Sequence, residues 1–140
     1  MFVVLDTNHF SELVRDSQCA AALERKIAES GGDVFVTIIT GQESFEGWFA
    51  LINRERAGRD QTKAYAQFLR SIETLVKFTI LPFDADAARV FHRLKDEGVR
   101  IGTMDLKIAS ICITRDMTLL SRNLVDFEKV TGLRVENWLD

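Results

Sequence analysis

Four acidic residues adjoin apolar segments of this chain, and their carboxylates are the side chains most suited to chemistry. Asp6 directly follows an apolar run, Glu43 follows a second run after a short polar turn, and Asp105 introduces a third. Asp126 follows a fourth run, again after a polar loop. Carboxylate oxygens are the ligands that hard cations such as Mg²⁺ prefer. If the fold brings these acids together, they would form a shared cation site.

Each acid also has an ordinary structural explanation. Asp6 could cap a helix, and from its position alone capping and cation binding are equally good explanations. Glu43 lies three residues after Thr40, as in a capping box, which taken alone is the better explanation. Asp105 would lie in the first turn of a helix, where the helix dipole favours a negative charge. Asp126 could cap a short helix or be solvated, so no acid is decisive by itself.

Strands and helices are expected to alternate along the chain. Apolar runs of strand length predict strands at 2–5, 34–39, 78–81, 118–121 and 133–136. A cap at Thr7 or Asn8 would open a first helix that reaches residue 14. Apolar residues at helical spacing, bounded by caps and glycines, predict further helices at 19–30, 40–56, 63–76, 84–97, 106–113 and 124–130.

This alternation predicts an α/β fold in which helices cover both faces of a parallel sheet. Ligands of such sheets bind beyond the carboxyl ends of the strands, where Asp6, the turn 40–43 and the loop 121–126 are expected. The break at 57–60 between two amphipathic helices further predicts a helical hairpin.

The composition is that of a globular protein, with 46% hydrophobic and 28% charged residues among 140. We expect a single domain spanning 1–140, because no linker or repeat divides the chain. The chain shows no signal peptide and no membrane span, so we expect a cytoplasmic protein with Cys19 and Cys112 reduced. The net charge of −3 slightly disfavours nucleic-acid binding, but without the charges of the four acids it becomes +1.

Four blocks of sequence, at 4–8, 40–43, 101–109 and 120–138, contain these acids. They read VLDTN, TGQE, IGTMDLKIA and LSRNLVDFEKVTGLRVENW. In order, spacing and flanking apolar residues, the blocks resemble the PIN-domain family, and specifically its VapC toxin branch. The resemblance extends along nearly the whole chain.

The resemblance implies a three-layer sandwich with a central parallel sheet and a protruding helical hairpin. It also implies a metal-dependent endoribonuclease in which Asp6, Glu43 and Asp105 bind Mg²⁺, with Mn²⁺ as a substitute. Asp126 stands where the VapC branch often has an acid and would complete the catalytic and metal-binding set, whereas Asn123 stands where many PIN domains have aspartate. The other polar residues expected in the pocket are Thr7, Asn8 and Ser121, together with Asn123.

The same resemblance implies partners for this chain. The substrate would be RNA, plausibly tRNA, cut to leave a 5′-phosphate and a 3′-hydroxyl, and a VapB-like antitoxin would block the pocket. A homodimer is implied as well, and the aromatic residues Trp48, Phe49, Tyr65 and Phe68 could line its contact or simply pack in the core. Four basic residues around the hairpin turn could approach the RNA backbone or could be solvated, namely Arg54, Arg56, Arg59 and Lys63.

Two other classes of protein also place acids at strand ends. A phosphotransfer protein would pair two acids near its first strand, but Asn8 occupies the second position of the Asp-x-Asp arrangement that one such class uses. A non-catalytic RNA-binding or interaction module with the same fold would lack pocket acids, whereas this chain has the three principal ones. Cation binding without RNA cleavage would favour that second alternative.

Overall fold

A single parallel sheet forms the centre of the protein. In the computed structural model, which describes residues 1–55, 58 and 61–140, the strands run in the order β3-β2-β1-β4-β5. All four neighbouring pairs are parallel. The strands are β1 (Phe2–Leu5), β2 (Asp33–Thr37), β3 (Thr79–Leu81), β4 (Thr118–Leu120) and β5 (Val135–Glu136). The predicted α/β class and parallel sheet are therefore confirmed.

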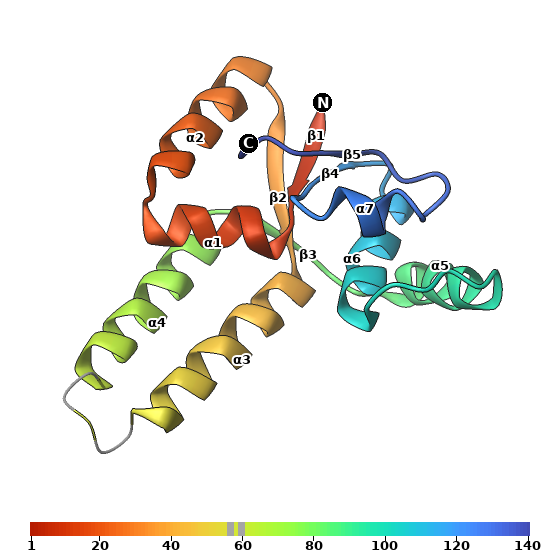
Figure 1. Cartoon of the computed structure of the whole chain (residues 1–140). Helices are drawn as coiled ribbons and strands as arrows, with labels where there is room; N and C mark the ends of the chain where they lie inside the picture. The colour runs from red at the N-terminus through yellow and green to blue at the C-terminus, as the bar shows by residue number, and fades with distance from the viewer. Residues whose placement is uncertain (56–57, 59–60) are drawn as a thin grey trace.

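Helices cover both faces of this sheet, as Figure 1 shows. On one side lie α1 (Thr7–Arg15) and α2 (Gln18–Ser30), and on the other lie α5 (Ala85–Asp96), α6 (Thr103–Thr114) and the short α7 (Leu124–Phe127). The helices α3 (Ile38–Arg54) and α4 (Gln61–Leu75) pack against each other and extend away from the sheet. This is the protruding hairpin that the sequence predicts.

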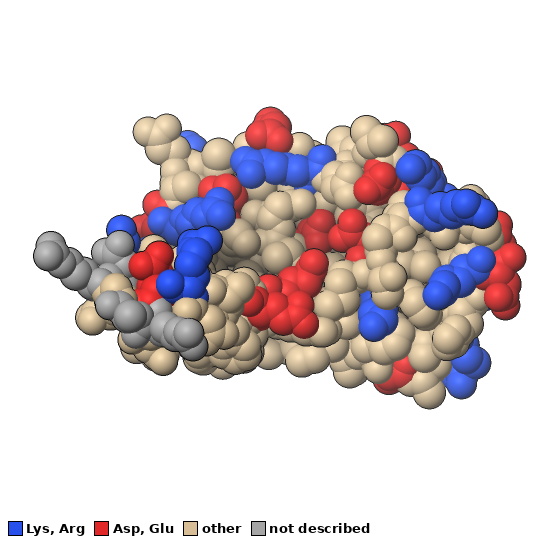
Figure 2. Space-filling model, turned by 60° about the horizontal axis from the view of Figure 1, so that its bottom comes forward, with Lys and Arg blue, Asp and Glu red and all other residues tan. Residues whose placement is uncertain are grey.

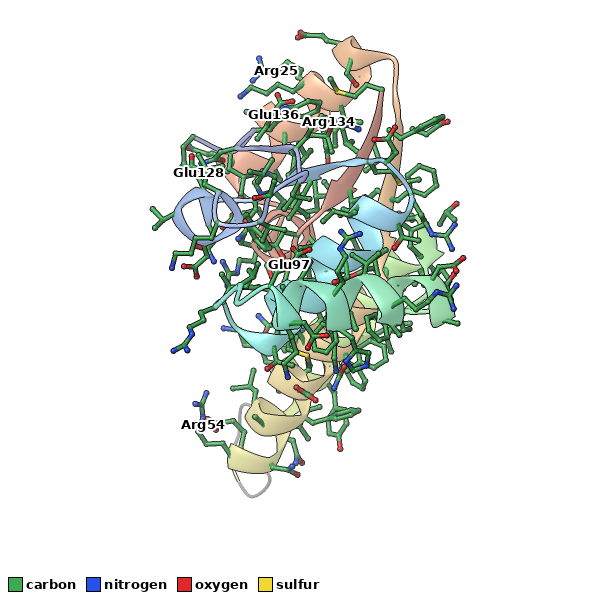
Figure 3. All side chains as sticks on the ribbon, turned by 90° about the vertical axis from the view of Figure 1, so that its right-hand side faces the viewer. Arg25, Arg54, Glu97, Glu128, Arg134 and Glu136 are labelled. Carbon is green, nitrogen blue, oxygen red and sulfur yellow. The ribbon has the colours of Figure 1, made fainter. Side chains whose placement is uncertain are left out.

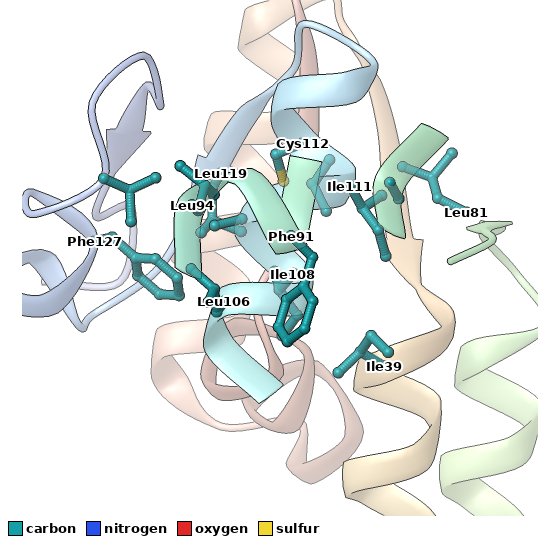
Figure 4. Packing of buried hydrophobic residues seen from close by; sticks show 14 residues of the cluster. Ile39, Leu81, Phe91, Leu94, Leu106, Ile108, Ile111, Cys112, Leu119 and Phe127 are labelled. Atoms are coloured by element: carbon teal, nitrogen blue, oxygen red, sulfur yellow. The ribbon is translucent and has the colours of Figure 1, made fainter. Parts of the chain in front are cut away.

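Alternation along β1 divides the core into two clusters, one on each face of the sheet. Val3 and Leu5 join the cluster that contains Phe10 of α1, whereas Val4 joins the cluster that contains Phe91 of α5. Successive residues of a strand point to opposite faces, so this short apolar strand is buried on both sides. Figure 4 shows the second cluster, in which Phe91 lies among aliphatic side chains from α6 and β4. Its members include Cys112, which is fully buried as expected.

The start of α3 differs from its prediction. The expected strand 34–39 ends at Thr37, and the helix already begins at Ile38. Thr37 is its N-cap, and its hydroxyl accepts a hydrogen bond from the backbone N–H of Thr40 at 3.1 Å. The capping-box interpretation of Glu43 is therefore wrong, because Thr40 is not the cap. Glu43 instead lies in the second turn of α3, and its side chain is free to face the sheet edge.

The cap of α1 decides between two predictions. Asp6 is the N-cap, and its Oδ1 accepts a hydrogen bond from the backbone N–H of Thr7 at 2.8 Å, so its capping interpretation is confirmed and the cap at Thr7 or Asn8 is wrong. The predicted helices 19–30 and 84–97 are bounded by a glycine and a cap as expected, since Gly31 ends α2 with a φ of 63° and Asp84 caps α5. The predicted end of α3 at residue 56 and its break at 57–60 fall, except for Gly58, outside the described residues. No helix in the described ranges is long and apolar enough to span a membrane.

Candidate active site

Asp6 lies at the carboxyl end of the central strand and is almost completely buried, with 3% of its surface exposed. Its backbone N–H continues the sheet by donating to the carbonyl of Leu120 at 2.9 Å. The hydroxyl of Ser121 donates to Asp6 Oδ2 at 2.6 Å, and Asn8 Nδ2 donates to the same oxygen at 3.3 Å. Donors from the end of β4 and from the first turn of α1 therefore fix this carboxylate in one orientation.

Glu43 approaches the same edge of the sheet from α3. The hydroxyl of Thr7 donates to Glu43 Oε1 at 2.6 Å, and it lies 3.1 Å from the hydroxyl of Thr40. Thr40 is fully buried one turn before Glu43 on the helix. Because Thr7 directly follows Asp6, this hydrogen bond joins the first two predicted acids across the start of α1 and α3.

Asp105 and Asp126 form the other side of the cluster. Asp105 lies in the first turn of α6, and Asp126 lies in α7. The side-chain amide of Asn123 lies between them, because its Nδ2 donates to Asp105 Oδ2 at 3.3 Å and to Asp126 Oδ2 at 3.0 Å. Lys129 also lies 3.4 Å from Asp126 Oδ1. The structure therefore places both Asn123 and Asp126 beside Asp105, rather than only one of them.

The four carboxylates share one electrostatic environment. Burial, and then the negative charge of Glu43, raises the pKa of Asp6 against the hydrogen bonds that lower it. Burial and the charge of Asp105 raise the pKa of Glu43. Burial and the charges of Asp6 and Asp126 raise the pKa of Asp105. Only the pKa of Asp126 is lowered, by its hydrogen bond from Asn123 and by Lys129. Each raised pKa thus depends in part on a neighbouring acid, so we treat the four residues as one acidic cluster.

This acidic cluster lies at the surface rather than in a closed cavity. Figure 2 shows Asp and Glu side chains gathered in the middle of one face, with Lys and Arg side chains around them. Within the described part of the chain, no three His, Cys, Asp or Glu side chains are arranged closely enough to hold one metal ion. The acids therefore face one another without converging on a single point.

His9 is a site-adjacent residue that the sequence analysis missed. It is fully buried, its Nδ1 lies 2.8 Å from Asn8 Oδ1, and its Nε2 accepts a hydrogen bond from the backbone N–H of Trp138 at 3.2 Å. Since Nε2 is the acceptor, Nδ1 carries the proton and donates to Asn8. Asn8 in turn donates to Asp6, so the C-terminal segment supports the acidic cluster. The only sequence signal for this role is the position of His9 beside the first acid block.

Arg54 and Lys63, the two described members of the four basic residues predicted to contact RNA, do not lie beside the acids. Arg54 lies at the far end of α3, where Figure 3 shows it next to the hairpin turn, and its Nε lies 3.7 Å from Glu55 Oε1. Lys63 lies near the start of α4 and lines a small pocket with Glu55. Arg56 and Arg59 lie outside the described residues.

Comparisons with known proteins agree with this architecture. The PIN domain family matches residues 3–133. Ribonuclease VapC1 of Rickettsia felis is 30% identical over 132 residues, covering 88% of this chain and 93% of that protein. The tRNA(fMet)-specific endonuclease VapC of Salmonella typhimurium is 27% identical over 86 residues, covering 58% of this chain and 65% of that protein. The structure of VapBC2 from Rickettsia felis, bound to a DNA fragment from their promoter, is similar with a TM-score of 0.74.

That last similarity covers 99% of each chain at 20% sequence identity, so it supports the fold alone. The family match and the full-length likeness to a VapC ribonuclease go further, because they span the same acids that the fold gathers at the sheet edge. The chain belongs to the PIN-domain family and, within it, to the VapC-type ribonucleases.

Proposed function

We propose that this protein is a divalent-metal-dependent endoribonuclease that cleaves tRNA and that a VapB-like antitoxin restrains. The observation that carries the proposal is the acidic cluster, in which burial of Asp6, partial burial of Glu43 and Asp105, and the charges of neighbouring acids raise the pKa values of all three. Three such carboxylates at one sheet edge repel one another and destabilise the fold unless a cation binds between them. Clustered acids with raised pKa values are therefore typical of a functional site.

The carboxylates of this cluster suit Mg²⁺ by donor type, with Mn²⁺ as a substitute, and three of them would have to draw closer together than the described residues do here to bind one ion. Asp6, Glu43 and Asp105 would hold the cation, since hard cations prefer carboxylate oxygens and would relieve the repulsion between them. Asp126, with the amide of Asn123, would complete the set. The bound cation would supply an activated water and neutralise charge on the scissile phosphate.

The residues of the chain orient the carboxylates and, in the absence of a cation, keep phosphate away from them. Ser121 and Thr7 hold the first two carboxylates through hydrogen bonds of 2.6 Å. A ligand could then use Glu43 Oε2 and the second lone pair of Asp6 Oδ1, whose hydrogen bond comes from the backbone N–H of Thr7. Without a cation the cluster repels phosphate, so cleavage would depend strictly on added metal. The products would carry a 5′-phosphate and a 3′-hydroxyl.

The proposed substrate and partners rest on relatives of this chain. A tRNA is the favoured substrate because one relative is named a tRNA(fMet)-specific endonuclease. A VapB-like antitoxin is favoured because similar solved structures are VapBC complexes. A homodimer is also proposed, since Phe49 and Tyr65 of the hairpin remain 48% and 53% exposed. The partly buried Trp48 and Phe68 pack within the hairpin region instead.

We also infer that the hairpin tip contacts the RNA backbone through Arg54 and Lys63. Both side chains lie at the open end of α3 and α4, away from the acids, where a long substrate would reach them. Phosphate contacts make RNA affinity depend on salt concentration. If Arg54→Ala combined with Lys63→Ala leaves this salt dependence unchanged, the tip does not bind the backbone.

The proposed function is tested by incubating purified, antitoxin-free protein with total tRNA in Mg²⁺, in Mn²⁺ and in EDTA, beside Asp105→Asn. The proposal expects cleavage in both metals, none in EDTA and a loss of cleavage in the variant, with 5′-phosphate ends on the fragments. Folded wild-type protein that binds tRNA in Mg²⁺ without cutting it would instead identify a non-catalytic RNA-binding module.

A further inference from the structure

A pocket opens directly beside the acidic cluster, between α1, α3 and the C-terminal half of α4. Its volume is about 270 Å³, and two of its lining residues, Thr7 and Glu43, belong to the acidic cluster itself. The rest of the lining is largely apolar and includes Phe10 and Val14 of α1 and Leu51 of α3. We call this hollow the α1–α3 pocket. It is continuous with the acids, yet the chemistry of its walls is different.

Small residues create the pocket. Ser11 of α1, Ser44 and Gly47 of α3 and Ser71 of α4 all line it, at positions where larger side chains would fill the space between these helices. A Cβ added at Gly47 would meet no atom within 4 Å, so the backbone of α3 borders open space there. The gap is therefore not closed by any of the neighbouring elements that the structure describes.

The pocket also contains a polar group without a partner. Ser71 is 1% exposed, and its hydroxyl makes no hydrogen bond to any of the described residues. A buried hydroxyl without a partner is costly, so its place in the wall of an open pocket favours a ligand that can hydrogen-bond to it. A purely aliphatic ligand would leave the hydroxyl of Ser71 without a hydrogen bond.

The lining selects a flat, uncharged ligand with polar edges. Trp48 provides an aromatic side chain, and bases that leave their stack bind to such surfaces in sequence-tolerant RNA recognition. Among the described residues the pocket has one cation in its lining, Arg15, which already pairs with Glu12 at 3.3 Å, and Glu43 in the same lining repels a phosphate group. The volume is slightly below the range of about 300–1,000 Å³ that holds drug-sized ligands, which favours one small ring system.

Resting on the proposed ribonuclease function, we propose that the α1–α3 pocket binds one unstacked nucleobase of the RNA, from the nucleotide next to the scissile phosphate. A phosphate held at the cation site of Asp6 and Glu43 would bring the neighbouring nucleotide to the mouth of the pocket, because Glu43 belongs to both. The base stacks on Trp48, and Ser71 hydrogen-bonds to its edge. The pocket then helps to choose which bond is cut.

The test uses an RNA oligonucleotide that wild-type protein cuts at one mapped bond, with abasic versions at the nucleotide on each side of that bond. Gly47→Leu fills the pocket from a position with free space, and Ala50→Leu adds the same side chain at an exposed position of α3 that does not line the pocket. Thermal unfolding shows whether both variants are folded. If Gly47→Leu does not fold, Ser11→Leu replaces it, because Ser11 lines the same pocket from α1.

The proposal predicts that one abasic substitution lowers kcat/KM of the wild type by about tenfold or more. Gly47→Leu should lower kcat/KM on the intact RNA to a similar degree and have no further effect on that abasic RNA. Ala50→Leu should match the wild type on both. Ser71→Ala should change which base is preferred next to the cut more than it changes the overall rate.

Three results would overturn the nucleobase assignment. The first is that Gly47→Leu lowers kcat/KM by the same factor on intact and on abasic RNA, which would show that the substitution disturbs the acids. The second is full cleavage by Gly47→Leu together with weaker binding of a co-purified protein, which would make the pocket a protein contact. The third is unchanged cleavage of both abasic RNAs by the wild type. Failure of the proposed function looks different, because the wild type would then cut no RNA in either metal.

Discussion

The two halves of the acidic cluster hold their carboxylates in different ways. In the half built on β1 and α3, a hydroxyl donates to each acid at 2.6 Å, from Ser121 to Asp6 and from Thr7 to Glu43. Asp6 is also 3% exposed and receives a backbone N–H. Short bonds to an ionised oxygen are among the stronger hydrogen bonds in proteins. This half is therefore arranged before any ligand arrives.

The half built on α6 and α7 is held more loosely. A single amide, that of Asn123, donates to both Asp105 and Asp126 at 3.3 and 3.0 Å, and the other partner of Asp126 is the half-exposed Lys129. Longer bonds near solvent restrict a side chain less. The comparison suggests that the β1–α3 half defines the site, whereas the α6–α7 half adjusts to the ligand.

The largest effect is expected from Asp6→Asn, which removes the negative charge at the most tightly held position. RNA cleavage in Mg²⁺ should fall by about a thousandfold. Because the buried carboxylate has a raised pKa and is costly to ionise, the variant should unfold at the same temperature as the wild type or higher. Full cleavage by the folded variant would show that the β1–α3 half does not define the site.

His9 offers a test of how the β1–α3 half is supported. Burial, and then the nearby Arg122, lowers the pKa of His9 from 6.5 to about 4. The unfolded chain therefore takes up a proton between these values while the folded chain does not. Stability from this residue should be complete above pH 6.5 and fall by about 3 kcal/mol as the pH drops to 4.

Urea unfolding of the wild type and of His9→Asn between pH 7.5 and 4 measures that contribution. The asparagine has no titrating group, but its amide can still donate to Asn8. The wild type should therefore lose more stability on acidification than the variant does. An identical pH dependence in both proteins would mean that His9 does not stay neutral beneath the cluster.

Thr7→Val tests the hydroxyl that holds Glu43. Valine has nearly the same shape, but it cannot donate to Glu43 or bond to Thr40. Loss of such an orienting partner commonly costs about tenfold to a hundredfold in activity. Thr7→Ser keeps the hydroxyl and should retain most of the cleavage rate. Equal rates for the two variants would show that the orientation of Glu43 is not set by this bond.

The smallest effect on cleavage is expected from Asp126→Asn in the α6–α7 half. The side chain of Asp126 is 37% exposed and bonds to Lys129 and Asn123, both of which an asparagine can still approach. Cleavage should fall by less than about tenfold. A loss as large as that of Asp6→Asn would remove the distinction between the two halves, and kinetic assays on one tRNA sample would compare both variants directly.

The sequence was sufficient to predict the sheet and the neighbourhood of its acids. Asp6 and Glu43 were expected at one sheet edge because they follow strands, and parallel strands end at the same edge. The cap of α3 was placed three residues late, because apolar residues such as Ile38 and Ile39 suit a strand and a buried helix equally well. Helix ends depend on individual hydrogen bonds, here from the backbone of Thr40 to Thr37.

The contacts that hold the site could not be predicted from local patterns. Ser121 lies 115 positions from Asp6 along the chain, and the backbone of Trp138 lies 129 positions from His9. Such pairs depend on the register of β1 with β4 and on the path of the C-terminal segment. The α1–α3 pocket was missed for the same reason, since its small residues come from three separate helices.

Binding of Mn²⁺, measured by isothermal titration calorimetry of wild-type protein and Asp6→Asn, tests most directly whether the acids form one cation site. We expect saturable binding by the wild type, over the same concentrations of Mn²⁺ that activate RNA cleavage, and little binding by the variant. Equal Mn²⁺ binding by both folded proteins would contradict it, because the cation would then bind somewhere other than the acidic cluster.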